Sequence, residues 1–549
     1  DFIADFPRTL RVVGPDSNGS FRGIILDGNS MGLLGWHPNT EEPYASLARA
    51  WAVSDDKRTV YFRLDPDAHF SDGEKITAAN YLFCFFFFQS SHIHDPWYNN
   101  FYSTEYTSIT QYDDLTIAIT LPRARPDFLE KAAGIRPLPM GFYSQLGDDY
   151  PTRYQWKFEP TTGPYELRAE DVKKGQSITL RRIENWWAND KRMYAHRFNA
   201  DAMQFNVIRD TNKAFELFLA GQIDMFNLNL PEYWYDRAPK APAVKAGYIN
   251  RTTFYNDVPR PTWGFYINTQ DALLKNIELR RGIDNSLNWD QVLRFFFRGD
   301  YDRMPTYAAG YGKFTNPNIQ ATLFDLDAAQ KHFAAAGFAT RGKDGILTRP
   351  DGTRLSVTVT ASEGPLTGSL MILKEEALKA GLELNLEILD GTTAFKKVSE
   401  KKHQIAFMAF NVSAERFPRY WEMFHGVNAK PQTNNLCNLD DKEINALIDR
   451  YDKEIDEKEI QKLSWMLQEK LKERACYLPA FMKPWYRVGY WRHWRFPAGF
   501  DVKQSGGPQD AGLYWFDAAA QKETQEAKAN GKTFDNTPKT FEQWRSSSK

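Results

Sequence analysis

The sequence predicts an α/β protein with more than one domain, and three observations support this. Segments that alternate apolar and polar residues, as half-buried strands do, recur along the chain, for example "TVYFRLDPDAHF" at 59–70. From about residue 262 onward, such strands alternate with helical segments, which is typical of α/β layers. At 549 residues, the chain is long enough for about two to four domains or one large interrupted domain.

The stretch "YLFCFFFF" at 81–88 is predicted to be part of a buried helix. A helix that crosses a bilayer needs about 20 apolar residues, and polar residues bound this run on both sides. Thr77 is placed to cap a helix, after a turn at Asp72 and Gly73. A helix that is aromatic on most faces is buried on most faces, so we expect a large domain around it and a soluble protein.

The remaining elements follow from local patterns. In the first half we expect strands at 10–13, 59–70, 114–122 and 177–187, and a strand, capped helix, Gly turn and strand within 203–226. In the second half we expect helices within 276–297, 325–337 and 375–381, and strands at 355–362, 382–389 and 404–412. A long amphipathic region at 441–475 is expected to form one helix or a helical hairpin. The polar segment after Phe516 is predicted to be a partly mobile surface tail.

Composition excludes several classes of function. The formal net charge is −1 with both signs interspersed, which argues against nucleic acid or an anionic membrane as the main partner. The chain has no GxSxG, HExxH, P-loop or GxGxxG motif. The "HIHD" stretch at 92–95 offers two histidines without further ligands, so we expect no metal site and no cofactor. The 16 Trp and 26 Tyr are residue types that often line ligand clefts, although each can equally belong to the core.

The three cysteines show no metal-binding spacing. Cys84 lies inside the Phe run and is predicted to be a small buried hydrophobe. Cys437 and Cys476 could form a disulfide in an exported protein, but their spacing in the sequence does not show whether they are close. The N-terminal residues do not form a signal peptide. A start at Asp1 without Met fits a mature exported chain.

A block at 46–85 carries a resemblance to a known family. It resembles the signature of bacterial extracellular solute-binding proteins of the oligopeptide/dipeptide-binding class, with Asn80 where the family usually has Asp. The matching residues in this block are Leu47, Ala48, Trp51, Phe62, Leu64, Phe70, Asp72, Gly73, Thr77 and Ala78. Three later blocks agree in order: "PTTGPYEL" at 160–167, "ELFLAGQIDM" at 216–225 and "LRRGIDNSLNWDQVL" at 279–293. The subgroup looks like the longer, Trp-rich type associated with uptake of peptides and peptide-like antibiotics.

The resemblance implies a two-lobed periplasmic-binding-protein clamshell with mixed β-sheets and two hinge crossings, near 262–269 and 483–491. Lobe I would comprise residues 1–262, with an inserted subdomain at about 45–160, and the C-terminal return at 488–549. Lobe II would comprise residues 263–487. Such a protein is a periplasmic, monomeric binding subunit. It captures peptides or peptide-like ligands between its lobes, delivers them to an ABC transporter permease, and catalyses no reaction.

The resemblance also suggests ligand-binding residues in lobe II. A peptide offers an ammonium, a carboxylate and backbone amides, which can be bound by acids, by Arg or Lys, and by strand edges. In the family, an acidic residue just after a lobe II strand binds the ligand's amine, and Glu415 is the best match here. Further candidates in this segment are Asn411, Arg416, Arg419, Tyr420 and Trp421. A solvated loop for the charged residues, and core packing for the aromatic ones, are the alternatives.

Lobe I offers a second set of candidates. Asn18, Gly19 and Ser20 follow the first strand, where lobe I of the family touches ligand, although they could equally form an ordinary turn. Trp485 lies at the second crossing and either contacts ligand or forms the hinge. An oligosaccharide-binding protein of the same fold is the alternative function, because Trp faces stack well on sugar rings. A hydrolase on an α/β scaffold is a further alternative, which convergent Ser or carboxylate groups would support.

Overall fold

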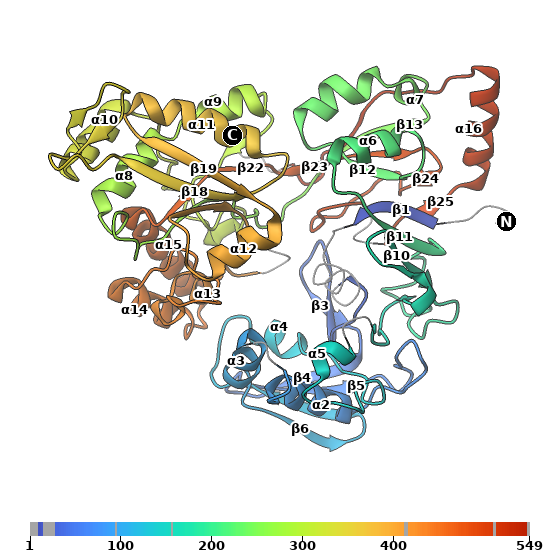
Figure 1. Cartoon of the computed structure of the whole chain (residues 1–549). Helices are drawn as coiled ribbons and strands as arrows, with labels where there is room; N and C mark the ends of the chain where they lie inside the picture. Colours follow the sequence, from blue (N-terminus) through green and yellow to red (C-terminus); the bar gives the residue numbers. More distant parts are fainter. Residues whose placement is uncertain are drawn as a thin grey trace. The chain divides into compact units, whose positions relative to one another are not determined.

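The computed structural model describes residues 9–14, 28–93, 96–154, 157–410, 416–508 and 512–545. The chain divides into two compact units (Figure 1). Unit 1 consists of Asp1–Asp257 and Trp485–Lys549, and unit 2 consists of Val258–Pro484. The chain therefore passes from one unit to the other at 257/258 and at 484/485. The boundaries predicted from the sequence, 262/263 and 487/488, lie a few residues beyond these points.

The β-structure of unit 1 is built mainly from three sheets. One sheet joins β1 (Thr9–Gly14), β11 (Ala202–Val207), β10 (Ser177–Arg182) and β8 (Tyr165–Glu166), with β9 (Val172–Lys173) beside β10. Another joins β12 (Met225–Asn227), β23 (Trp485–Trp491), β13 (Ile249–Tyr255) and β26 (Lys539–Phe541). The third joins β4 (Ala48–Val53), β5 (Thr59–Leu64), β7 (Thr116–Thr120) and β6 (Ser108–Asp113). Two short pairs are β2 (Leu34–Trp36) with β3 (Pro43–Ala45) and β24 (Trp494–Arg495) with β25 (Trp515–Phe516).

The helices of unit 1 are short. They are α2 (Ala78–Gln89), α3 (Pro96–Glu105), α4 (Phe128–Ala133), α5 (Tyr150–Arg153), α6 (Thr211–Leu219), α7 (Pro242–Lys245) and α16 (Ala518–Asn530), with a π-helix at Glu232–Arg237. The predicted strand, capped helix, Gly turn and strand within 203–226 is confirmed. Asp210 caps α6 through Lys213 N–H, and Gly221 makes the turn before β12 at a φ of 78°.

The predicted helix around the Phe run is confirmed as α2, but its predicted burial is only partly right. Thr77 and Asn80 form a reciprocal capping box, in which Thr77 N–H donates to Asn80 Oδ1 at 2.9 Å. Cys84 and Phe87 are buried, as expected for this stretch. Phe86, however, is 64% exposed, because nothing in the described part of unit 1 covers that side of the helix.

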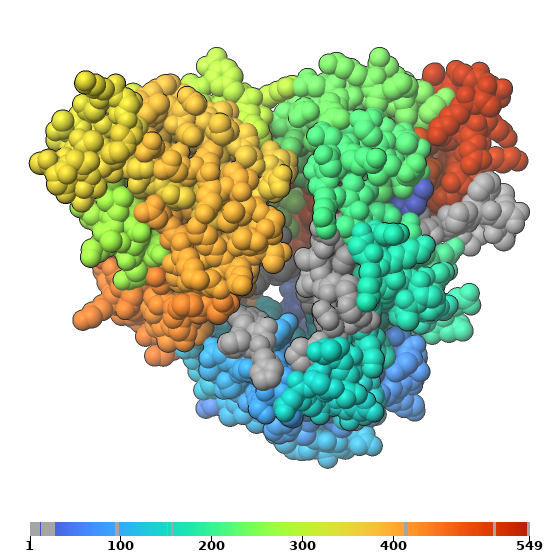
Figure 2. Space-filling model, in the orientation of Figure 1, coloured from blue at the N-terminus to red at the C-terminus, as the bar shows by residue number. Residues whose placement is uncertain are grey.

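The segment after Phe516 lies at the surface, as predicted, but it has regular structure that the sequence analysis did not predict. The segment forms α16 and then β26, which pairs in parallel with β13. Lys528 on α16 lies over the Trp491 ring, with its Nζ 4.2 Å from the ring centroid. Figure 2 shows this C-terminal segment in red on the surface of unit 1, beside the green residues. The polar sequence thus covers the edge of a sheet.

Unit 2 is an α/β unit around one mixed sheet. The sheet has the order β19 (Glu383–Leu389), β18 (Ser356–Ser362), β20 (Ile405–Met408), β14 (Gly264–Ile267) and β21 (Tyr477–Pro479). β18 runs parallel to both neighbours, whereas β14 is antiparallel to both of its own. Short pairs are β15 (Asp302–Arg303) with β22 (Phe481–Met482) and β16 (Thr340–Arg341) with β17 (Leu347–Thr348).

The helices of unit 2 confirm the long helical segments predicted for the second half. They are α8 (Ile277–Ser286), α9 (Trp289–Gln291), α10 (Leu326–Ala335), α11 (Thr367–Lys379), α12 (Gly391–Ser399), α13 (Trp421–Phe424), α14 (Lys442–Tyr451) and α15 (Glu457–Arg474). The expected hairpin at 441–475 is the pair α14 and α15, which Asp441 and Asp456 cap. In the described part of the chain, no helix is long and apolar enough to span a membrane.

Candidate ligand-binding residues

Half of the residues predicted to bind ligand fall outside the described part of the chain. These are Asn18, Gly19 and Ser20, which follow β1, and Asn411 and Glu415, which follow β20. The structure describes the other five. Arg416, Arg419, Tyr420 and Trp421 lie in one run of unit 2, directly before and within α13, and Trp485 begins β23 of unit 1.

Arg416 is held at the surface of unit 2 by an acid. Its guanidinium lies 2.8 Å from Glu457 Oε1, and Lys313 Nζ lies 2.8 Å from the other oxygen of the same carboxylate. The ion pair with Lys313, followed by Arg416, lowers the pKa of Glu457. Glu457 therefore stays ionised at neutral pH, and a ligand carboxylate would have to compete with it for Arg416.

The two aromatic residues of this run differ in their surroundings. Tyr420 is only 1% exposed, and its hydroxyl bonds to Ser464 Oγ at 2.9 Å. The structure therefore places Tyr420 in the core of unit 2, where it packs against Tyr451, and it cannot form a wall of a binding surface. Trp421 is half-buried and stacks on His425 at a centroid distance of 6.1 Å. Its indole remains a candidate contact.

Arg419 combines a surface ion pair with a structural role. Its guanidinium lies 3.4 Å from Glu422 Oε2, one turn along the chain. Its carbonyl accepts a hydrogen bond from the Tyr307 hydroxyl at 3.1 Å. This hydrogen bond holds the backbone at Arg419 against Tyr307 within unit 2.

Trp485 belongs to a group of side chains on one face of the β23 sheet, which we call the aromatic–arginine cluster. It consists of Trp234 and Tyr235 from the π-helix, Arg251 from β13, and Trp485 and Arg487 from β23. The Arg487 guanidinium lies 4.2 Å from the Trp485 ring centroid, 4.7 Å from that of Trp234 and 5.3 Å from that of Tyr235. Three rings thus surround one cation, each at a distance favourable for cation–π attraction.

The cluster keeps positive charge in a poorly hydrated place. Arg487 is only 8% exposed, and its guanidinium also donates to the Tyr235 hydroxyl at 3.3 Å. The Arg251 guanidinium also lies over the Trp234 ring, 5.5 Å from its centroid, and burial lowers the pKa of Arg251. It donates to the Trp234 carbonyl at 3.4 Å, and its Nε is buried without a hydrogen-bond partner among the described residues. Such a group favours an added anion.

Of the residues in this cluster, only Trp485 was predicted from the sequence to bind ligand. The alternation in "WYRVGYW" places Trp485 and Arg487 on the same face of a strand, which is a signal that could have identified Arg487. No local pattern could have shown that Trp234 and Tyr235, some 250 positions away in the chain, cover that face. Arg251 comes beside them because β13 pairs with β23, with Thr253 opposite Arg487.

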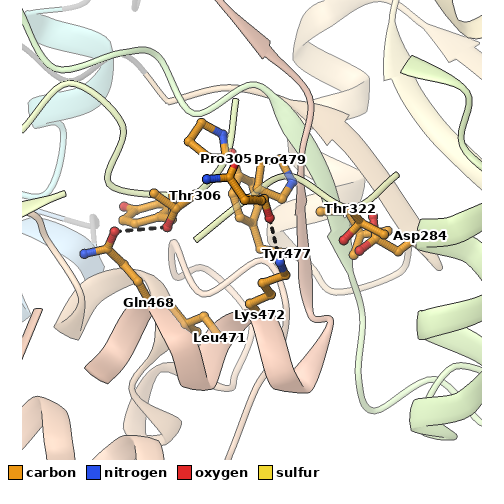
Figure 3. A pocket seen from close by; sticks show the side chains of 12 residues that line it. Asp284, Pro305, Thr306, Thr322, Gln468, Leu471, Lys472, Tyr477 and Pro479 are labelled. Carbon is orange, nitrogen blue, oxygen red and sulfur yellow. Dashed lines mark hydrogen bonds between the residues drawn. The ribbon is translucent and has the colours of Figure 1, made fainter. Parts of the chain in front are cut away.

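A small pocket lies within unit 2, at the ends of α8, α15 and β21 (Figure 3). Gln468 and Thr306 hydrogen-bond at 3.2 Å on one side, and Asp284 and Thr322 lie on the other. Burial raises the pKa of Asp284, although Thr322 and Arg303 partly oppose this. None of the residues predicted to bind ligand lines this pocket.

The described residues do not suggest a metal site. They contain no group of three or more His, Cys, Asp or Glu side chains placed to hold an ion. In the "HIHD" stretch, His92 Nδ1 lies 2.7 Å from Asp148 Oδ1, at the surface of unit 1. His94 and Asp95 lie outside the described part.

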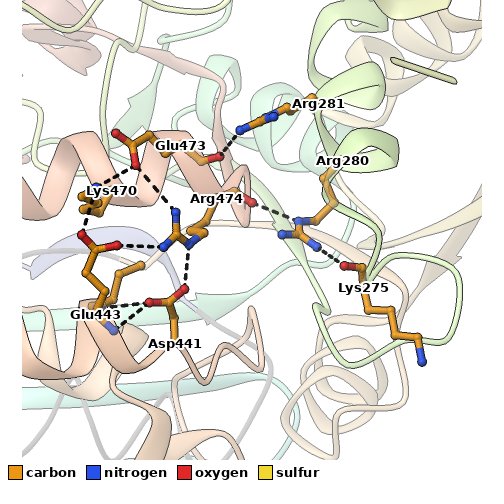
Figure 4. Close-up of polar contacts among 9 residues, drawn as sticks. Lys275, Arg280, Arg281, Asp441, Glu443, Lys470, Glu473 and Arg474 are labelled. Carbon is orange, nitrogen blue, oxygen red and sulfur yellow. Dashed lines mark hydrogen bonds and ion pairs between the residues drawn. The ribbon is translucent and has the colours of Figure 1, made fainter. Parts of the chain in front are cut away.

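A network of charges fixes the base of the α14–α15 hairpin (Figure 4). Arg474 pairs with Asp441 at 2.6 Å and with Glu443 at 2.9 Å, and so joins the end of α15 to the start of α14. Buried Arg280, from the family-like block at 279–293, donates to the carbonyl of Arg474 at 3.0 Å and to that of Leu274 at 2.8 Å. These contacts are internal to unit 2, so this motif residue has a structural role.

Comparison with known protein families identifies the family of this chain. Residues 42–431, which are most of the chain, match the model of "Bacterial extracellular solute-binding proteins, family 5 Middle". The chain belongs to this family. The family and its fold are those of solute-binding transport proteins rather than of enzymes.

Individual relatives are distant. A "Probable ABC transporter-binding protein" of Deinococcus radiodurans is 24% identical over 385 residues, which are 65% of this chain and 63% of the relative. The chain thus matches less than two thirds of that protein's length. A solved structure of the periplasmic binding protein DppA from Helicobacter pylori in complex with the peptide STSA has a TM-score of 0.77 at 18% identity. That alignment covers 93% of this chain and 97% of the other.

A third similar protein carries a different ligand. The periplasmic oligopeptide-binding protein of Thermotoga maritima, solved with bound mannohexaose, has a TM-score of 0.74 at 16% identity, with 92% and 94% of the two chains covered. At these identities the solved structures show the fold. The predicted α/β periplasmic-binding-protein fold with mixed sheets is thereby confirmed.

Proposed function

We propose that this protein is the extracytoplasmic binding subunit of an ABC importer that captures peptides or peptide-like ligands and delivers them to a membrane permease. The observation that carries the proposal is the family match over residues 42–431. It is supported by similarity over nearly the whole chain to a protein whose structure contains a bound peptide. The protein acts by capture: ligand binds one arrangement of the units more tightly and so increases its population.

In this proposal, the ends of the peptide meet opposite charges. Glu415 pairs with the ligand's ammonium, as the resemblance implies, with Asn411, Arg419 and Trp421 nearby in the chain. The aromatic–arginine cluster supplies a positive, poorly hydrated surface for a carboxylate or a peptide carbonyl. Asn18, Gly19 and Ser20 offer hydrogen bonds to the ligand's backbone. Trp485 and Tyr235 supply aromatic faces beside Arg487, and Tyr235 is 46% exposed.

An oligosaccharide is the second candidate ligand. The mannohexaose in the similar Thermotoga maritima protein favours it, as do exposed or half-buried aromatic rings, on which sugars stack. The two candidates differ in charge. A neutral sugar gains little from Glu415 or from the guanidinium of Arg487, whereas a peptide with free termini needs both.

A thermal-shift screen tests the proposal on the whole chain. Ligand at 100 times its Kd adds about 2.7 kcal/mol to the stability, which raises the Tm measurably. We expect short peptides with free termini to raise the Tm, and the same peptides with acetylated and amidated ends to raise it much less. A rise with neutral oligosaccharides alone would replace the peptide proposal with the sugar alternative, and no rise with either class would contradict both.

A further inference from the structure

Cys437 and Cys476 are buried together at the base of the α14–α15 hairpin. Cys437 lies before α14 and Cys476 follows α15, and both are 0% exposed. The Cys437 thiol donates to the Cys476 carbonyl at 3.1 Å, and each thiol shifts the pKa of the other. Residues 39 positions apart in the chain thus lie next to each other.

The backbone of strand β14 holds the two cysteines at a suitable spacing. Ile267 N–H donates to the Cys476 carbonyl at 2.9 Å, and Thr269 N–H donates to the Cys437 carbonyl at 2.8 Å. These donors are two residues apart in the chain, at the end of β14 and just after it, so the two carbonyls that they hold are close together. A disulfide requires cysteines with neighbouring backbones. The 3.1 Å contact between the Cys437 sulfur and the Cys476 carbonyl shows that these two cysteines are neighbours.

Neighbouring contacts fix each cysteine from its own side. Arg474, two residues before Cys476, pairs with Asp441, four residues after Cys437. Lys401 Nζ donates to the carbonyls of Thr433 and Asn435, and His403 Nε2 donates to that of Leu436. Because the backbone is already held on both sides, joining the sulfur atoms requires little movement.

We propose that Cys437 and Cys476 form a structural disulfide that closes the base of the α14–α15 hairpin when the chain folds in an oxidising compartment. The oxidant is a disulfide, carried by a thiol-oxidising protein or a small molecule. The two S–H bonds break and one S–S bond forms. The S–S bond of the oxidant breaks, and its two sulfur atoms take up the two electrons and two protons and so become two thiols. The burial of both sulfur atoms means that the bond forms during folding and is then shielded from exchange.

The local electrostatics fit this chemistry. The neighbouring Cys437 thiol and the nearby Arg280 guanidinium lower the pKa of Cys476, whereas burial raises that of Cys437. The thiolate of one cysteine attacks the oxidant's disulfide, and the other cysteine then displaces the oxidant to complete the bond. Cys84 provides an internal contrast, because it lies in unit 1 and burial raises its pKa to about 12.

The test is refolding of the whole chain under two redox conditions. The unfolded chain is refolded either with oxidised and reduced glutathione or with an excess of reductant. Free thiols are then alkylated in denaturant and counted by intact mass. We expect one alkylated cysteine, Cys84, after oxidative refolding and three after reductive refolding. Proteolysis of the oxidised sample should yield one cross-linked pair of peptides that contains Cys437 and Cys476.

The oxidised protein should also have a higher Tm than the reduced protein, by about 5 °C or more, because the bond restricts the unfolded chain. The Cys84→Ala variant should show the same difference, and the Cys437→Ser/Cys476→Ser double variant should show none. Three alkylated cysteines after oxidative refolding, a disulfide that includes Cys84, or equal Tm values would each overturn the proposal. None of these results depends on ligand binding, so they leave the proposed transport function untouched.

Discussion

Unit 1 and unit 2 each contain an arginine within or beside the residues predicted to bind ligand, and the surroundings of these two arginines differ. In unit 1, Arg487 lies among the rings of Trp234, Tyr235 and Trp485. In unit 2, Arg416 lies beside the carboxylate of Glu457, which also binds Lys313. An exposed ion pair gains little from a further carboxylate. A guanidinium on aromatic faces keeps its charge in a place where an added anion interacts strongly. We therefore expect substitution of Arg487 to affect peptide binding more than substitution of Arg416.

Glu415→Ala should have the largest effect on binding. Removal of the acid leaves the buried ammonium of the ligand without an opposite charge, which costs roughly 3–5 kcal/mol. We expect the Kd for a peptide with free termini to rise at least a hundredfold, as measured by isothermal titration calorimetry. Glu415→Gln keeps the shape and removes the charge, so it should lose nearly as much. An unchanged Kd in both variants would remove Glu415 from the site.

The stability of unit 2 should fall as the pH falls from 6.5 to 4, whereas that of unit 1 should fall only at lower pH. Burial lowers the pKa of His403, which is 3% exposed, to about 4. The unfolded chain binds this proton below about pH 6.5 and the folded chain does not, so the transition removes about 3 kcal/mol of stability.

In unit 1, burial raises the pKa of Glu105, but Lys131 and Arg125 outweigh it and bring the pKa to about 2. This stabilising contribution is present above about pH 4.5 and is lost only below it. As the pH is lowered, hydrogen exchange followed by mass spectrometry should therefore show loss of protection in unit 2 before unit 1. His403→Gln should remove most of the pH dependence of unit 2. Equal pH responses of the variant and the parent would rule out His403 as the cause.

Arg487→Ala should weaken peptide binding by about 30-fold or more. Truncation of one partner of a buried, hydrogen-bonded charge pair costs about 2–5 kcal/mol. Arg487→Lys keeps the charge but loses the planar donor fork, so we expect an intermediate Kd by calorimetry. Peptides with an amidated C-terminus should be much less sensitive to either substitution. If the amidated and free peptides lose affinity equally, the cluster does not bind the carboxylate.

Arg416→Ala should have the smallest effect and serves as the matched control for Arg487. Its pair with Glu457 is exposed, and such pairs contribute about 0–1 kcal/mol to stability. We expect the Tm to change by at most a few degrees and the peptide Kd to stay within about twofold, measured in the same titrations. A loss of affinity as large as that of Arg487→Ala would show that Arg416 leaves Glu457 to bind ligand.

Local sequence patterns predicted much of the fold because they depend on neighbours in the chain. The cap at Asp210, the alternation in β5 and the paired helices α14 and α15 follow from residues a few positions apart. The matches to the family also fall largely on structural residues. Asp224 holds Arg11 of β1 at 2.7 Å, and a Cβ on Gly163 would meet the Asn29 carbonyl at 2.2 Å. A residue with such a structural contact matches the family motif because the fold needs it, and not because it binds ligand.

The rest could not be predicted because it depends on distant parts of the chain. The exposure of Phe86 is decided by what packs around α2, and β26 is a short polar strand that forms because β13 offers it an edge. The aromatic–arginine cluster combines the π-helix with two paired strands. Tyr420 was expected to line the binding surface, but the hydroxyl of Ser464 holds it in the core.

Native mass spectrometry of the freshly purified whole chain tests the central claim most directly, namely that the protein binds peptides. The complex is weighed, the protein is denatured, and the released molecules are sequenced by fragmentation. We expect the released molecules to be short peptides, and the mass of each complex to equal that of the chain plus one of these peptides. Released molecules spaced by hexose masses, or an empty protein that no peptide re-binds, would contradict it.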